Sequence, residues 1–140
     1  MNLELIRLQS NADERGCLTS VESKREYPFD IKRIFYMHNI VDGEKRGGHA
    51  HPDTDQMAIA VSGSVIISTF LDSKTQEFVL DDPTVGLLLP RMTWTELRNF
   101  SPSAVCLVLA NTLYDPSLVI RDFDEYTERL KTKTLRNLND

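Results

Sequence analysis

Apolar and polar residues alternate over short stretches through most of the chain, and turn-forming residues separate these stretches. Asp72-Ser73 and Asp82-Pro83 are two such separators, and Ser62-Gly63 between two β-branched runs predicts a tight hairpin. This pattern predicts an all-β sandwich or barrel. The predicted strands are Leu3–Leu8, Ile31–His38, Met57–Val61, Ser64–Leu71, Glu77–Leu80, Gly86–Leu89, Trp94–Asn99 and Ala104–Ala110.

The predicted strand 31–38 mixes apolar and polar side chains on both of its faces, because side chains alternate along a strand. Such a mixture suits a strand that lines a polar cavity inside a barrel, and it equally suits a strand with an imperfect surface face. One face carries Lys32, Ile34, Tyr36 and His38, and the other carries Ile31, Arg33, Phe35 and Met37.

The C-terminal tail is the one region with helical periodicity. Phe123, Tyr126 and Leu130 recur at helical spacing, Asp122 is a candidate N-cap, and Glu125 would complete a capping box. We therefore expect a short amphipathic helix over about residues 122–134, packed across the barrel.

Length and charge restrict the kind of protein further. The 140 residues and 16.0 kDa fit a single domain spanning 1–140. The net charge of -5 argues against a general nucleic-acid or membrane-surface binder, so any bound phosphate must be met by a local group of cations.

The N-terminus has no continuous apolar stretch resembling a signal peptide, which predicts a cytoplasmic protein. Cys17 and Cys106 give neither a disulfide framework nor a zinc-ligand spacing.

The chemistry of the chain concentrates at His49 and His51, two of its three histidines. Residues two apart on a strand point the same way, so the two imidazoles should lie side by side. Histidines often have structural roles, but two on one face after Arg46-Gly47-Gly48 favour a functional site.

The segment around these histidines resembles the first motif of the cupin superfamily, G-x5-H-x-H-x4-E-x6-G, through Gly43, His49, His51, Gln56 and Gly63. Gln56 stands where metal-binding members carry glutamate. The second motif, P-x-G-x2-H-x3-N, is echoed by Pro90, Met92, Thr95 and Asn99, with Thr95 in place of the third metal histidine.

Two of the four ligand positions have thus changed to an amide and a hydroxyl, which are poor replacements for a carboxylate and an imidazole. We therefore expect no metal and no other cofactor. The histidines are then free for proton transfer near neutral pH.

A narrower resemblance covers nearly the whole chain. The strings DIKRIFYMHNI, KRGGHAHPDTDQ, LLLPRMTWTEL and LANTLYDPSLVIRDFDEY are similar to the metal-free sugar-nucleotide 3,4-ketoisomerases of the cupin superfamily, of the WxcM-like C-terminal domain type. This resemblance implies a cupin jelly-roll barrel with a short C-terminal α-helix. It also implies isomerisation of dTDP-4-keto-6-deoxyglucose to the 3-keto sugar, in pathways to deoxy- and amino-sugars of bacterial surface polysaccharides.

Roles for individual residues follow from that chemistry. His51 is assigned as the base at carbon and His49 as the group that moves the oxygen-bound proton, although the sequence does not order them. Tyr36 is a candidate hydrogen-bond donor to the enediolate, or simply a barrel-lining aromatic. Gln56 is a candidate partner for a sugar hydroxyl or a histidine. The remaining candidates are Arg33 and Arg46 for the diphosphate, Arg15 and Arg98 as weaker alternatives, and Trp94 or Phe35 for stacking on thymine.

Two other functions stay open at this stage. A 3,5-epimerase of the same nucleotide sugars also removes protons next to a ketone without metal, and a non-catalytic sugar-binding cupin needs no catalytic pair. A barrel of this length has strand edges to cover, so we expect a homodimer.

Overall fold

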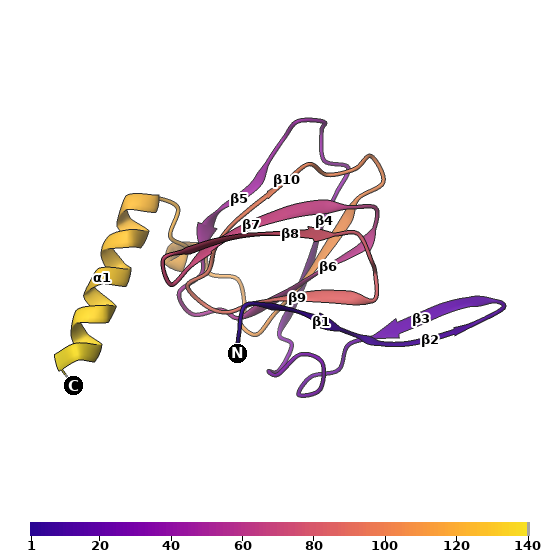
Figure 1. The fold of residues 1–140 in the computed structure, drawn as a ribbon, viewed down its shortest axis with the longest axis horizontal. Coiled ribbons are helices and arrows are strands. Elements are labelled where there is room, and N and C mark those ends of the chain that lie inside the picture. The colour runs from indigo at the N-terminus through magenta and orange to yellow at the C-terminus, as the bar shows by residue number, and fades with distance from the viewer. Residues whose placement is uncertain (140) are drawn as a thin grey trace.

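The computed structural model describes residues 1–139 and contains two antiparallel sheets that face each other as a barrel (Figure 1), which confirms the all-β expectation. The five-stranded sheet has the order β1 (Glu4–Arg7), β9 (Val85–Leu89), β6 (Gln56–Ser62), β11 (Val105–Ala110) and β4 (Arg33–His38). The four-stranded sheet has the order β5 (Arg46–Ala50), β10 (Trp94–Arg98), β7 (Val65–Leu71) and β8 (Lys74–Leu80).

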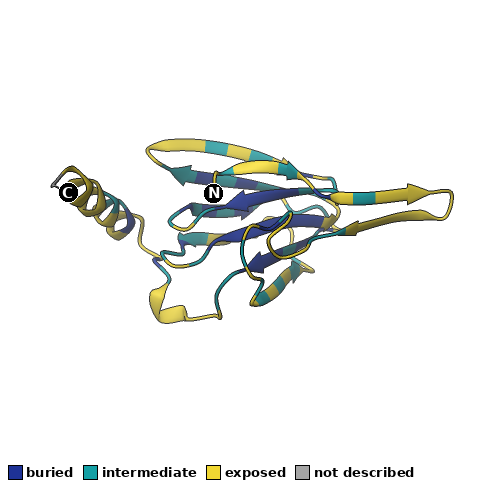
Figure 2. Cartoon of the chain, turned by 90° about the horizontal axis from the view of Figure 1, so that it is seen from below, coloured by how far each residue is buried: buried dark blue, intermediate teal, exposed yellow. Residues whose placement is uncertain are grey.

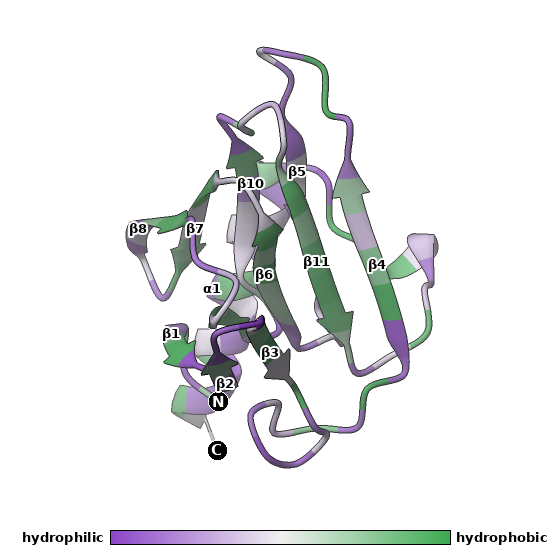
Figure 3. Cartoon of the chain, turned by 90° about the vertical axis from the view of Figure 1, so that its right-hand side faces the viewer, coloured by the Kyte–Doolittle hydropathy of each residue, from purple (hydrophilic) through white to green (hydrophobic). Residues whose placement is uncertain are grey.

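The core lies between the two sheets. On β7 the residues Val65, Ile67 and Thr69 are buried while their neighbours are only partly so, because alternate side chains point into the barrel. Cys106 and Val108 of β11, in the opposite sheet, belong to the same core cluster as Val65 and Ile67. Figure 2 shows the buried residues along the middle of both sheets, and Figure 3 shows hydrophobic residues along β6 and β11.

A second apolar cluster covers the outside of the five-stranded sheet. Tyr27, in the irregular segment between β3 and β4, is fully buried there against Met57, Ile59 and Leu109. Its hydroxyl donates a 2.6 Å hydrogen bond to the backbone carbonyl of Asp55. This cluster ties the chain before β4 to the start of β6.

The expected hairpin at Ser62-Gly63 is wrong. Strands β6 and β7 lie in different sheets, so this turn carries the chain from one sheet to the other. Gly63 has φ +64°, and a Cβ there would lie 2.8 Å from the backbone of Ala104. A hairpin does join β7 to β8, where Asp72 and Ser73 both take positive φ.

One ribbon was not expected from the sequence. Strands β2 (Gln9–Asp13) and β3 (Gly16–Ser20) pair with each other and project from the barrel at the end opposite the C-terminal helix (Figure 1). Both strands are mostly exposed. Their sequences lack the alternation of apolar and polar residues that indicates a strand with one buried face.

The C-terminal helix α1 (Phe123–Asn139) follows a 3-10 turn, η1 (Pro116–Leu118), and runs past the expected end near residue 134. Asp122 caps it as expected, since its Oδ1 accepts a 2.9 Å hydrogen bond from the backbone N–H of Asp124.

The expectation that this helix packs across the barrel is wrong. Tyr126 is fully buried beside Phe70 and Trp94, but Leu135 and Leu138 are exposed, and Figure 1 shows the helix leaving the barrel. Only the first turns of α1 therefore contact the sheet. Within residues 1–139, no helix is long and apolar enough to span a membrane.

Candidate active site

A β-bulge on β5 sets the direction of the two histidines. Thr95 pairs with His49 and Glu96 pairs with Gly47, which leaves Gly48 without a partner. Gly47 and Gly48 have φ +84° and +75°, and a Cβ on Gly47 would lie 2.8 Å from the Thr95 carbonyl oxygen. Glycine is therefore required where the strand bends.

Beyond the bulge, His49 and His51 point to the same side of the chain, as their spacing predicts. Their ring centroids are 4.8 Å apart and their planes are nearly perpendicular, at 89°. Ala50 points the other way, is fully buried, and exchanges two backbone hydrogen bonds of 2.9 Å with Ile120. The segment that precedes α1 thus holds the histidine strand in place.

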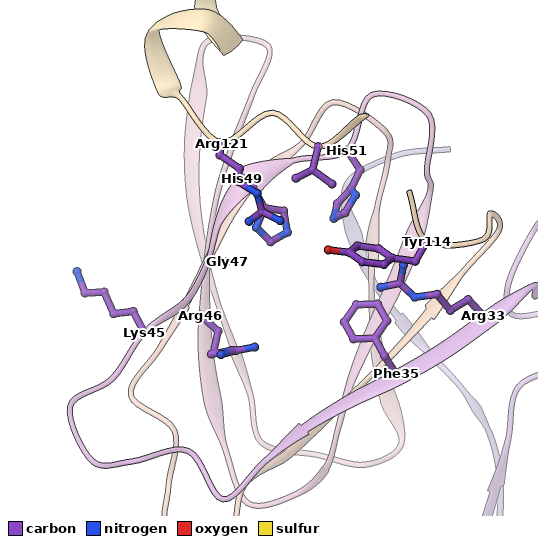
Figure 4. A pocket seen from close by; sticks show the side chains of 10 residues that line it. Arg33, Phe35, Lys45, Arg46, Gly47, His49, His51, Tyr114 and Arg121 are labelled. Carbon is purple, nitrogen blue, oxygen red and sulfur yellow. The ribbon is translucent and has the colours of Figure 1, made fainter. Parts of the chain in front are cut away.

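The histidines open into a cavity of about 390 Å³ with a cationic wall (Figure 4). The side chains around it that the structure describes include no carboxylate, although the whole protein is acidic. Such a wall suits an anionic ligand. The cations that line the cavity are Arg33, Lys45, Arg46 and Arg121.

Burial and these positive charges keep both imidazoles neutral. Burial lowers the pKa of His51 to about 4, and the nearby His49, Arg33 and Arg121 act in the same direction. The pKa of His49 is also lowered, mainly by burial, although the nearby Gly47 carbonyl acts against this. Within residues 1–139, His49 Nδ1 is buried and has no hydrogen-bond partner. Neutral imidazoles can accept protons at pH 7.

Arg33 is held in position by two aromatic rings. Its guanidinium carbon lies 4.4 Å from the ring centroid of Phe35 and 4.5 Å from that of Tyr114. Figure 4 shows the Tyr114 hydroxyl pointing into the cavity. The cavity thus combines two bases, a phenol donor and a fixed cation.

A smaller chamber of about 200 Å³ lies behind His49, inside the barrel. Gln56 and Thr95, the two positions that differ from the metal-binding cupin motif, are buried and line it together with His49. The motif positions therefore do converge in space. Among residues 1–139, no three His, Cys, Asp or Glu side chains come together in an arrangement that could hold a metal ion.

Tyr36 does not line the 390 Å³ cavity, contrary to expectation, although it borders the smaller chamber behind His49. It is 60% exposed on the outer face of β4, where its ring lies 5.5 Å from that of His38. The alternate residues Arg33 and Phe35 face inward instead. The sequence of β4 predicts two alternating faces, but the hydropathy of these faces does not indicate which one turns inward.

Three other expected site residues also lie outside the cavity. Arg15 is at the tip of the β2–β3 ribbon, where it pairs with Asp13 at 2.7 Å. Arg98 points outward and bonds Ser68 and Glu77 across the four-stranded sheet.

Trp94 packs under α1, with its ring centroid 5.1 Å from that of Phe123. Arg33, Arg46 and Gln56 do lie beside the histidines, as expected.

Sequence reasoning missed Lys45, Tyr114 and Arg121 as site residues. Tyr114 and Arg121 were part of the C-terminal string that resembles the ketoisomerases, which was the available signal. Their approach to the histidines depends on the pairing of Ile120 with Ala50, a contact between distant segments.

A protein-family model described as FdtA, WxcM-like C-terminal, matches residues 1–131. The chain belongs to this family. A relative from Aneurinibacillus thermoaerophilus, the TDP-4-oxo-6-deoxy-alpha-D-glucose-3,4-oxoisomerase, is 34% identical over 126 residues, covering 90% of this chain and 91% of the relative.

Solved structures agree with this membership. The 3,4-ketoisomerase QdtA from Thermoanaerobacterium thermosaccharolyticum, solved as a histidine-to-asparagine variant with TDP-4-keto-6-deoxyglucose, superposes with a TM-score of 0.90. It is 36% identical, covering 94% of this chain and 95% of its own. A dTDP-4-dehydrorhamnose 3,5-epimerase from Bacillus anthracis has a TM-score of 0.71 at 15% identity, covering 82% of this chain and 75% of its own, which shows a shared fold alone.

Proposed function

We propose that this FdtA-family protein is an isomerase that converts a TDP-linked 4-keto-6-deoxyhexose to the 3-keto sugar. The observation that carries the proposal is the pair of neutral imidazoles, 4.8 Å apart, at the wall of a cationic cavity. The 3,4-ketoisomerase names of relatives at 34% and 36% identity support the choice of substrate. A role in deoxy- and amino-sugar synthesis follows from the same resemblance.

The proposed reaction is an internal redox exchange between two adjacent carbons. A base removes the C3 proton, and its electron pair forms an enediolate with the C4 carbonyl. A proton then moves from the C3 oxygen to the C4 oxygen, and C4 is reprotonated. The C3 alcohol is oxidised to a ketone as the C4 ketone is reduced to an alcohol, so no external oxidant or reductant is consumed.

We assign His51 as the base at carbon and His49 as the group that transfers the proton between the oxygens. Two neighbouring neutral imidazoles can accept and return protons in turn, which this sequence of steps requires. We assign the enediolate donor to Tyr114 instead of Tyr36, because its hydroxyl points into the cavity (Figure 4).

We assign the diphosphate to the cationic wall. Arg33 is fixed between two rings and can present its guanidinium fork to phosphate oxygens. Arg46 and Arg121 line the same cavity and would share the negative charge. Gln56, in the inner chamber, is positioned to hydrogen-bond His49 or the sugar.

The deciding experiment is incubation with TDP-4-keto-6-deoxyglucose in deuterated buffer. Deuterium at C4 of a 3-keto product supports the isomerase, deuterium at C5 would indicate 3,5-epimerisation, and no incorporation would indicate a binding protein.

Variants of the histidines test their roles. His49→Asn and His51→Asn should each abolish exchange while circular dichroism remains that of the folded protein. Full activity of either variant would refute its role, and a stoichiometric metal in the active enzyme would refute the metal-independent mechanism.

We also propose that the protein is a cytoplasmic homodimer. Strands β4 and β1 are the edges of the five-stranded sheet, and exposed Ile34 on β4 would be covered by a second copy. Sedimentation analysis and cell fractionation test these two expectations, and a monomer or a membrane fraction would contradict them.

A further inference from the structure

The loop after His51 contains a buried carboxylate that the proposed reaction does not use. Asp55 is only 3% exposed, and burial alone would raise its pKa. Hydrogen bonds from Arg91 and Asn111 outweigh burial and hold the Asp55 pKa below its usual value, so the group is ionised. Hydrogen bonds to an ionised carboxylate are strong, so Asp55 holds its donors Arg91 and Asn111 in a fixed arrangement.

Asp55 binds the turn that contacts His51. Its Oδ1 accepts a 2.8 Å hydrogen bond from the backbone N–H of Arg91, and its Oδ2 accepts a 2.9 Å bond from the Arg91 side chain. The next backbone N–H, that of Met92, donates a 2.8 Å hydrogen bond to the carbonyl of His51. Asp55 and the backbone of the proposed base therefore bind the N–H groups of two consecutive residues, Arg91 and Met92.

The turn at residues 90–93 is strained, so it depends on such anchors. Thr93 N–H bonds the Pro90 carbonyl at 3.1 Å, which closes a β-turn with Met92 at its third position. Met92 has φ +69°, a conformation that favours glycine, and glycine is the residue of the cupin motif at this position. A non-glycine residue there persists only when its surroundings hold it.

A second side chain binds the same turn at its next carbonyl. The single O–H of Tyr126 on α1 is shared between two carbonyl oxygens, that of Met92 at 2.6 Å and that of Phe70 at 3.0 Å. The first turns of the helix therefore brace the turn that Asp55 anchors.

We propose that Asp55 is a positioning residue for His51, acting through the Arg91–Met92 turn, with Tyr126 as its counterpart on α1. This role rests on the proposed function for its catalytic consequence. The structural part, that Asp55 controls the environment of the His51 ring, is independent of any substrate.

The test is Asp55→Asn, with the His51 pKa measured by NMR titration of the substrate-free protein. A loosened turn admits water to the ring, so the pKa should rise by about one unit toward its ordinary value. Loss of a negative charge alone would shift the pKa downward, so the sign separates positioning from direct electrostatics. The groups that lower the His51 pKa besides burial are His49, Arg33 and Arg121. The other charged or titratable groups around His51 are Asp53, Tyr114 and Asp115, and none of these six is altered.

Kinetics provide the second readout. A misplaced base reduces kcat about tenfold or more, whereas KM for the nucleotide sugar should change less than about threefold, because the cationic wall is intact.

Asp13→Asn is the matched control. It makes the same change at an exposed carboxylate, which pairs with Arg15 at the tip of the β2–β3 ribbon, so the His51 pKa and kcat should stay at their wild-type values.

Tyr126→Phe keeps the test decisive if Asp55→Asn does not fold. It removes the hydroxyl that bonds the Met92 carbonyl and should shift the His51 pKa in the same upward direction. An unchanged or lowered His51 pKa in the folded Asp55→Asn variant, or in Tyr126→Phe if that variant alone folds, overturns the proposal. If the protein lacks isomerase activity but the pKa shifts upward, only the proposed function fails.

Discussion

Acid should destabilise the protein because His51 takes up a proton more readily in the unfolded chain than in the folded protein. The His51 pKa is about 4 in the folded protein and near 6.5 in the unfolded chain. Below pH 6.5 the unfolded chain therefore binds more protons, so the free energy of unfolding falls as the pH decreases until about pH 4. At pH 5 this difference corresponds to at most about 2 kcal/mol, and water in the open cavity reduces it to about 1 kcal/mol.

The assay is urea denaturation at pH 7.5 and pH 5.0, at one protein concentration, for the wild type and for His51→Asn. The loss of stability between the two pH values should be smaller in the variant by about 1 kcal/mol, because other titrating groups largely cancel in the comparison. His38→Asn is the matched control, since His38 is exposed on the outer face of β4, and it should keep the full loss. An equal loss of stability in the wild type and in His51→Asn would refute the argument that burial keeps this imidazole neutral.

Four further substitutions test the fold and the cavity. Gly63→Ala should lower the free energy of unfolding by about 2 kcal/mol or more, because its Cβ would clash with Ala104 backbone atoms at 2.8 Å; wild-type urea stability would contradict this. Tyr27→Phe removes the 2.6 Å hydrogen bond to the Asp55 carbonyl and should cost about 1–2 kcal/mol in the same assay, whereas no loss would mean that the bond contributes nothing. Arg121→Met should weaken TDP binding about tenfold by calorimetry, and unchanged affinity would remove Arg121 from the diphosphate site. Tyr114→Phe should reduce kcat about tenfold or more with little change in TDP affinity, and an unchanged kcat would exclude the phenol as the enediolate donor.

Local patterns predicted the features of this protein that depend on neighbouring residues. Alternation of apolar and polar residues located most strands of the barrel, and helical spacing with the Asp122 cap located the start of α1. The His49–His51 spacing predicted two imidazoles on one side of the chain, since a strand has a period of two.

Where local patterns failed, the missing information was which elements pack together. The alternation of β4 left open which face turns inward, so Tyr36 was chosen although Arg33 and Phe35 face the cavity. The exposed β2–β3 ribbon has no buried face, so hydropathy had no signal to give. The direction of α1 depends on where Tyr126 is buried, which its own sequence does not contain.

The sequence by itself therefore determined most strands of the barrel, the histidine pair and the family resemblance, because each depends on short spacings or on residue identity. Tertiary structure alone decided that Tyr114 and Arg121 face His49 and His51, through the pairing of Ala50 with Ile120. It also decided the lowered pKa of both histidines and the anchoring of His51 by Asp55. Burial, charge and hydrogen bonding at this site come from segments that are distant in the chain, and only folding brings them within reach of one another.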